Sequence, residues 1–148
     1  MRTILDDAHT WFLENLVYAD ELAVLVVEGF KNEEPEDIRV GSHVIRDTHR
    51  LEPREQSRRC VLRFPDALAW QLVDESATTR DPEDVWEDDS FRYLQTLSKS
   101  SYLAYTLSHH GWYAELRGPV KHYRLWTESD VLDVVAHSEP IIEVERGT

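Results

Sequence analysis

The sequence predicts an α+β fold, a curved antiparallel sheet or partly closed sandwich with an N-terminal helix and one short internal helix. Three observations lead to this prediction. Short runs of β-branched and aromatic residues recur between turn residues along most of the 148 positions. Two segments combine helical spacing with capping residues. No repeat, linker or low-complexity segment divides the chain, so we expect residues 1–148 to form a single domain.

The first helix is expected over residues 8–17. Asp6 or Asp7 precedes it and can cap its first turn. The side chains that would share one face of this helix are Trp11, Phe12, Asn15 and Leu16. This spacing predicts an amphipathic helix that packs on the rest of the domain.

The following segments read as strands separated by loops. The apolar run 22–27 predicts a buried strand, and 38–46 predicts a second strand that bulges at Gly41. Residues 59–64 and 67–73 flank the turn residues Pro65 and Asp66, which predicts that they pair as a hairpin.

The second half begins with residues 74–89, which contain eight acids and are expected to form a solvated loop. A strand is predicted over 91–97. Ser98 or Ser100 can then cap a short helix over 101–107. The last three expected strands are 120–126, 131–136 and 141–144.

Charge is the strongest functional signal in the chain. There are 29 acidic and 16 basic residues, which gives a net charge of −13. Residues 39–63 hold seven arginines against three acids, so this segment is about +4 and the remainder about −17. An excess of this size disfavours nucleic acid and anionic membranes and favours a basic partner. We expect the arginines to pair with acidic loops of the same domain.

Composition also bears on the compartment. Cys60 is the only cysteine, which excludes an intramolecular disulfide and fits a reducing environment. The acidic N-terminal segment predicts no signal peptide, and the longest apolar run, 22–27, is too short to span a bilayer. These observations predict a cytoplasmic protein.

Patterns typical of catalysis or cofactor binding are weak. His43, Asp47 and His49 share a strand face but lack further ligands at a recognisable spacing, and the pair at 109–110 lacks them too. Cys60 lies within a strand pattern, where a free cysteine usually packs as a small apolar residue. The five glycines form no phosphate-binding loop. We therefore expect no cofactor, no metal and no catalytic residue.

Two aromatic residues among polar neighbours predict two surface patches for a protein partner. The acidic stretch 81–89 surrounds one tryptophan, and a second tryptophan follows the pair of histidines. Buried aromatic anchors with charged surroundings are typical of binding hot spots. The alternative is that both tryptophans hold loops on the core. The predicted partner-binding residues are Asp81, Glu83, Asp84, Trp86, Glu87, Asp88, Asp89 and Trp112.

Four blocks, FPDALAWQLVDES, SKSSYL, HYRLW and VLDVV, resemble a family of small uncharacterised bacterial proteins over residues 58–143. The resemblance implies no activity. In its size, its acidity and its lack of catalytic patterns, the chain resembles the immunity proteins of bacterial toxin systems. The polar residues of the matched blocks are Glu75, Ser98, Tyr102, His122 and Tyr123. They either form a structural hydrogen-bond network or line a pocket.

Together these features favour a non-enzymatic acidic binding protein, an immunity-type inhibitor of a basic toxin. Two alternatives stay open. One is a small-ligand-binding protein or enzyme with a pocket near Glu75, Tyr102, His122 and Tyr123. The other is a homo-oligomeric structural protein, in which the arginine segment meets an acidic loop of another copy.

Overall fold

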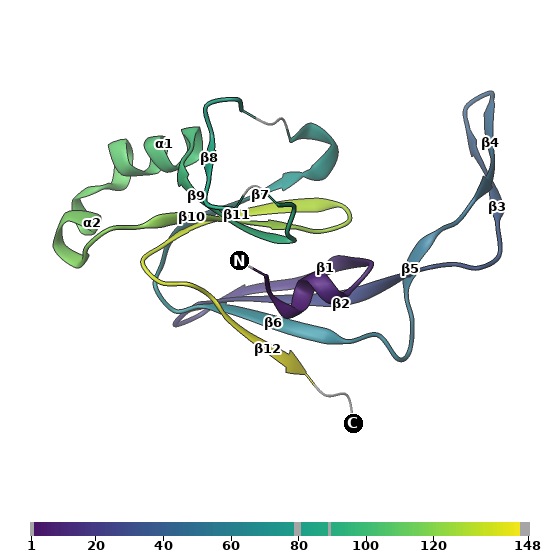
Figure 1. Ribbon diagram of the computed structural model, residues 1–148, viewed down its shortest axis with the longest axis horizontal. Helices are drawn as coiled ribbons and strands as arrows, with labels where there is room; N and C mark the ends of the chain where they lie inside the picture. The colour runs from purple at the N-terminus through teal and green to yellow at the C-terminus, as the bar shows by residue number, and fades with distance from the viewer. Residues whose placement is uncertain (1, 79–80, 89, 146–148) are drawn as a thin grey trace.

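Two five-stranded antiparallel sheets face each other in the computed structural model, which describes residues 2–78, 81–88 and 90–145 (Figure 1). Sheet 1 has the order β1-β2-β6-β12, with β5 also paired to β2. Its strands are β1 (Thr10–Tyr18), β2 (Leu22–Lys31), β5 (Leu51–Pro53), β6 (Arg59–Phe64) and β12 (Ile141–Glu145). Sheet 2 has the order β7-β11-β10-β9-β8. Its strands are β7 (Ala67–Asp74), β11 (Asp130–Ala136), β10 (Lys121–Trp126), β9 (Leu94–Lys99) and β8 (Val85–Trp86).

The remaining elements are short. Helices α1 (Ser101–His110) and α2 (Trp112–Arg117) follow β9 and lie on the side of sheet 2 that faces away from sheet 1 (Figure 1). Single 3₁₀ turns, η1 (Ile4–Asp7) and η2 (Glu75–Ala77), precede β1 and follow β7. Strands β3 (Glu36–Val40) and β4 (His43–Thr48) pair only with each other.

The core lies between the two sheets and draws on both. Trp11, Leu62 and Phe64 of sheet 1 and Leu125 and Leu132 of sheet 2 belong to one cluster and are at most 1% exposed. Burial of each such side chain contributes about 1.5–3 kcal/mol. The Trp11 indole N–H also donates to the carbonyl oxygen of Leu5 at 2.7 Å, so its polar atom is satisfied inside the core.

The predicted N-terminal helix is wrong, and with it the predicted α+β class, because residues 10–18 form strand β1. A capping box between Thr3 and Asp6 is present, but it closes only the single turn η1. The pairing of β1 with β2 shifts register between Leu13 and Asn15. This bulge interrupts the two-residue alternation of a strand, so the apolar residues fall at a spacing that resembles a helix.

The predicted hairpin across Pro65 and Asp66 is also wrong, although both strands exist. β6 pairs with β2 and β12 in sheet 1, whereas β7 pairs with β11 in sheet 2. The turn therefore carries the chain from one sheet to the other. Turn residues indicate where a chain reverses, but they do not specify which strands pair afterwards.

The single strand expected over 38–46 is instead a hairpin that projects from the body as an arm (Figure 1). Gly41 has φ = 61° at the turn between β3 and β4, a conformation that glycine adopts at little cost. The arm, residues 36–48, exposes large apolar side chains on both faces: Ile38, Val40, Val44 and Ile45 are 38–59% exposed.

Several arginines of residues 39–63 pair with acids of the strands rather than with the acidic loop 74–89. Arg58 forms a two-pronged pair with the buried Glu28 on β2, with nitrogen–oxygen distances of 3.1 and 2.8 Å. Arg59 pairs with Glu14, and Arg63 contacts both Glu21 and Glu143. Hydrogen bonds from Arg58 outweigh burial and lower the pKa of Glu28.

Among the described residues, no helix combines the length and apolar character that crossing a membrane requires.

We expect Leu62→Ala to lower the free energy of unfolding by about 2–5 kcal/mol, because it leaves a cavity between the sheets. Leu72→Ala is the matched control, since Leu72 is 49% exposed at the edge strand β7, and its loss should be much smaller. Urea denaturation of both variants measures the difference. Equal losses would contradict a core between the two sheets.

Candidate functional site

The outer face of sheet 2, which points away from sheet 1, carries buried polar residues. Along β10, Tyr123 and Leu125 belong to the core, so His122 and Arg124 point to the other face. On β11, Asp133 lies between the core residues Leu132 and Val134 and also points outward. Helix α1 and the segment before β9 cover this face, so it stays largely out of solvent (Figure 1).

Asp133 is the centre of a hydrogen-bonded group. Its Oδ1 accepts from His122 Nε2 at 2.6 Å and from Arg124 Nε at 2.7 Å. Its Oδ2 accepts from Gln71 Nε2 at 3.0 Å. Burial alone would raise the pKa of Asp133, but the hydrogen bonds from His122 and Arg124 outweigh it and hold the pKa below its usual value. The carboxylate is therefore ionised inside the protein.

Ser100 extends this group to helix α1. Its Oγ lies 2.7 Å from His122 Nδ1 and accepts the N–H of Leu103 at 3.0 Å, so Ser100 is the N-cap of α1. A single ring proton on Nε2 satisfies every partner, because Ser100 Oγ–H can then donate to Nδ1. The Tyr102 ring packs edge-on against His122, with ring centroids 5.3 Å apart.

The order serine, histidine, aspartate resembles a nucleophilic triad, but its arrangement is closed. His122 is completely buried, and its two ring nitrogens are engaged by Ser100 Oγ and Asp133 Oδ1. Ser100 Oγ is occupied as a helix cap. Asp133 is already paired with Arg124. The chain Ser100–His122–Asp133–Arg124 links α1 to sheet 2.

A cleft of about 610 Å³ opens beside this chain. Its lining combines one cation with two acids, hydroxyl groups and aromatic rings. The lining residues are Gln71, Asp81, Asp84, Ser100, Ser101, Tyr102, Tyr105 and Arg124. The Arg124 guanidinium lies between two indoles, with its central carbon 5.6 Å from the Trp86 ring and 5.7 Å from the Trp126 ring.

The two acids of the cleft differ in environment. Asp81 accepts from the Glu83 N–H at 2.9 Å and from Ser101 Oγ at 2.8 Å, which lowers its pKa. Burial raises the pKa of Asp84, with repulsion from Asp81, and the attraction of Arg124 offsets only part of this. Within the described chain, no ion pair or side-chain hydrogen bond engages the Asp84 carboxylate.

The structure disperses the partner surface predicted around residues 81–89. Glu87 pairs with Lys121 at 2.9 Å, and Asp88 lies 3.7 Å from Arg92. Trp86 is half-buried against Arg124, which fits the alternative that it holds the loop on the core. Glu83 is exposed. Asp89 lies outside the described residues.

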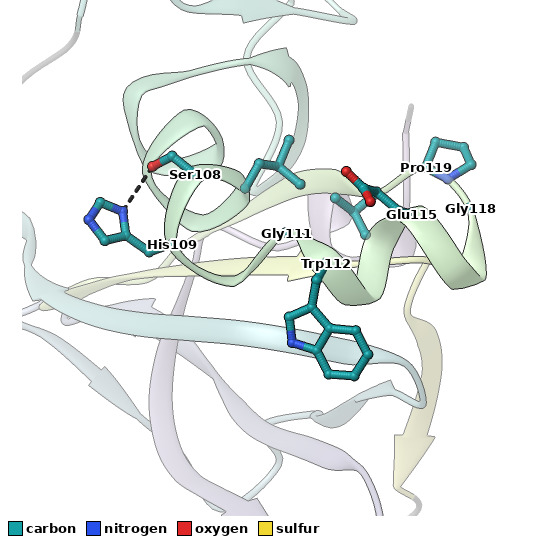
Figure 2. A pocket seen from close by; sticks show the side chains of 9 residues that line it. Ser108, His109, Gly111, Trp112, Glu115, Gly118 and Pro119 are labelled. Carbon is teal, nitrogen blue, oxygen red and sulfur yellow. Dashed lines mark hydrogen bonds between the residues drawn. The ribbon is translucent and has the colours of Figure 1, made fainter.

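Trp112 lies apart from that loop, at the start of α2, and is 68% exposed. It borders a second cavity of about 730 Å³ between the two helices and the segment that leads to β10. Ser108 and His109 lie at one end of this cavity, and Gly118 and Pro119 lie at the other (Figure 2). The acidic loop 81–89 and Trp112 therefore belong to two separate patches.

The second predicted set, the polar pocket, is only partly brought together. Tyr102 and His122 meet, and burial raises the pKa of Tyr102 to about 12. Tyr123 points into the core, where its ring lies 6.1 Å from that of Phe64. Glu75 borders a different cavity, with His9 and Phe91. Ser98 is exposed on β9.

Sequence reasoning missed Asp133, Arg124 and Gln71 as site residues. A usable signal existed, because a charged residue inside an apolar strand such as 131–135 is buried only when it is paired. Arg124 stands in the same position between Tyr123 and Leu125.

Among the described residues, no group of three or more histidine, cysteine, aspartate or glutamate residues could hold a metal ion. Cys60 is free and fully buried, and burial raises the pKa of its thiol.

Comparison with protein-family models, with curated proteins and with solved structures finds no match to this chain.

We expect Ser100→Ala to lower the free energy of unfolding by about 1–3 kcal/mol, because it removes a helix cap and leaves a buried ring nitrogen unpaired. Ser98→Ala, two residues earlier and exposed, should change it by less than about 0.5 kcal/mol. Thermal and urea denaturation compare the two. Equal effects would show that the contact between Ser100 and His122 does not secure α1.

Asp133→Asn should cost about 3–5 kcal/mol, because it leaves the buried Arg124 without a counter-charge. Since folding lowers the pKa of Asp133, its contribution to stability is full above about pH 4, near the pKa of an unfolded aspartate. That contribution disappears as the pH falls through the lower folded value. The variant should lose this part of the acid dependence, which urea denaturation between about pH 5 and pH 2 measures.

The exposed substitution Glu83→Gln is the control and should keep the acid dependence of the parent protein. An Asp133→Asn variant with the parent's acid dependence would show that another carboxylate is responsible.

Proposed function

We propose that this protein is a non-enzymatic binding protein that captures a basic protein partner, in the manner of an immunity-type inhibitor of a basic toxin in the cytoplasm. One observation carries the proposal. Asp84 lines the outer cleft and the neighbouring Glu83 is exposed, and within the described chain no ion pair engages either carboxylate. Other acids of the same loop are already paired with cations of this protein.

The charge of the whole chain supports this choice of partner. A net charge of −13 attracts a basic protein over a distance of about 8–10 Å at physiological ionic strength. Asp84 adds a local reason. Burial of its carboxylate carries a cost that the attraction of Arg124 offsets only in part, so a lysine or arginine side chain from a partner would relieve the remainder.

The aromatic residues of the cleft suit the same ligand chemistry. Tyr102 and Tyr105 line the cleft beside the acids, and aromatic faces attract guanidinium and ammonium groups. Ser100 is buried and its Oγ caps α1, which supports a structural use of this hydroxyl and, with it, a binding role over a catalytic one. Inhibition by such a surface needs only steric and electrostatic complementarity.

Co-expression with the product of the neighbouring gene tests the proposal. We expect a stable complex if that product is basic, with a dissociation constant that rises with salt concentration. The charge reversal Glu83→Lys with Asp84→Lys should weaken the complex at least about 100-fold, because truncating or reversing a buried charge contact costs several kcal/mol.

The matched control is Glu33→Lys with Glu34→Lys, which makes the same change in net charge at exposed positions before the arm. Isothermal titration calorimetry measures both double variants. Equal weakening by the two would show that only overall charge matters, and absence of any complex with a basic neighbour would refute the proposed function.

A further inference from the structure

The guanidinium of Arg124 is held in place with hydrogen-bonding capacity to spare. Its side chain is 9% exposed, and only its Nε bonds to Asp133. Within the described residues, the buried Nη1 has no hydrogen-bond partner. An arginine offers five N–H donors in a rigid fork, and leaving buried donors unpaired is costly. The Nη1 end of the guanidinium therefore lacks an acceptor, whereas its Nε has one in Asp133.

The surroundings fix the direction of this fork. Asp133 holds Nε, and the indoles of Trp86 and Trp126 lie on the guanidinium at 5.6 and 5.7 Å. Asp133 is itself held by His122 and Gln71. Arg124 lines the outer cleft, and these contacts hold its guanidinium in place rather than leaving it a mobile surface side chain.

A second group of donors reaches the same cleft from helix α1. The first N–H groups of a helix have no acceptor within the helix, and the Ser100 cap satisfies only that of Leu103. Ser101 and Tyr102, the first two residues of α1, both line the cleft. A carboxylate placed between Arg124 and this helix end would meet donors from both.

Asp81 and Asp84 line the same cleft and favour a positively charged group in the ligand. A simple anion beside Arg124 would be repelled by Asp84 and Asp81, and a simple cation would leave Arg124 without an acceptor. Only a ligand with a negative and a positive group close together satisfies both. The presence of both signs of charge in one cleft thus favours a zwitterion.

We propose that the outer cleft binds a small zwitterion of the α-amino acid type, with its carboxylate at Arg124 and the start of α1 and its ammonium group at Asp84. The tyrosines Tyr102 and Tyr105 would face the ligand's side chain. The amino acid would take the place at Asp84 that the proposed function gives to a partner's cation, so the two would compete. The site itself does not rest on the proposed function, because a free ligand needs no partner.

Titration of the isolated protein with single L-amino acids tests the site. The probes are free L-amino acids, their N-acetyl derivatives, which lack the ammonium group, and their amides, which lack the carboxylate. We expect at least one free amino acid to bind, and both of its derivatives to bind at least about tenfold more weakly. Isothermal titration calorimetry measures the affinities.

The location of binding needs a separate readout. The indole N–H signal of Trp86 in a nitrogen–proton NMR spectrum should shift on titration, because this ring lies on Arg124. Asp84→Asn should weaken binding at least about tenfold, whereas Glu34→Gln, which removes one acid at an exposed position before the arm, should not. These variants keep Arg124 and Asp133 paired, so the fold is not at risk.

Three results would overturn the proposal. The first is that no free amino acid binds. The second is that an N-acetyl derivative or an amide binds as tightly as its parent, which would reveal an anion or cation site instead. The third is binding that leaves the Trp86 signal unchanged. A failed search for a protein partner would leave these titrations unaffected, so the two proposals can fail separately.

Discussion

The ionised carboxylate of Asp133, buried on the outer face of sheet 2, is the constraint on which this half of the structure depends. A charge in that position has to be matched by donors, and His122, Arg124 and Gln71 supply them from strands on both sides of β11. His122 in turn needs Ser100, which caps α1. One buried charge therefore decides where the helix begins and which side chains can form the wall of the cleft.

The two faces of sheet 2 illustrate different solutions to burial. The inner face packs against sheet 1 through apolar side chains, as Leu125 and Leu132 do. The outer face has no second sheet to cover it, so a helix and an acidic segment do so instead, and they leave a cleft. This cover is made of a loop and the end of a helix, so it presents carboxylates and backbone N–H groups to the cleft. In a second sheet, the backbone N–H groups would instead be paired between strands.

Sequence reasoning located many of the strands and narrowed the N-cap of α1 to Ser98 or Ser100, of which Ser100 is the cap, because these features depend on local residue patterns. It failed where the outcome depends on distant pairing. The bulge in β1 hid the strand alternation behind a helical spacing, and the turn at Pro65 gave no sign that β6 and β7 join different sheets. Of the site, the sequence predicts Asp81, Asp84, Tyr102 and His122. It does not predict Asp133 and Arg124, since their contact depends on the register between β10 and β11.

The arm formed by β3 and β4 has a consequence for how this fold can vary. The Asn32 N–H donates to the Arg50 carbonyl oxygen at 2.7 Å, so the chain leaves the body and returns to it at one point. The arm belongs to neither five-stranded sheet, and its strands pair only with each other. Residues between these two positions could be shortened, lengthened or replaced by another domain while β2 and β5 keep their register, which makes the arm a natural insertion point.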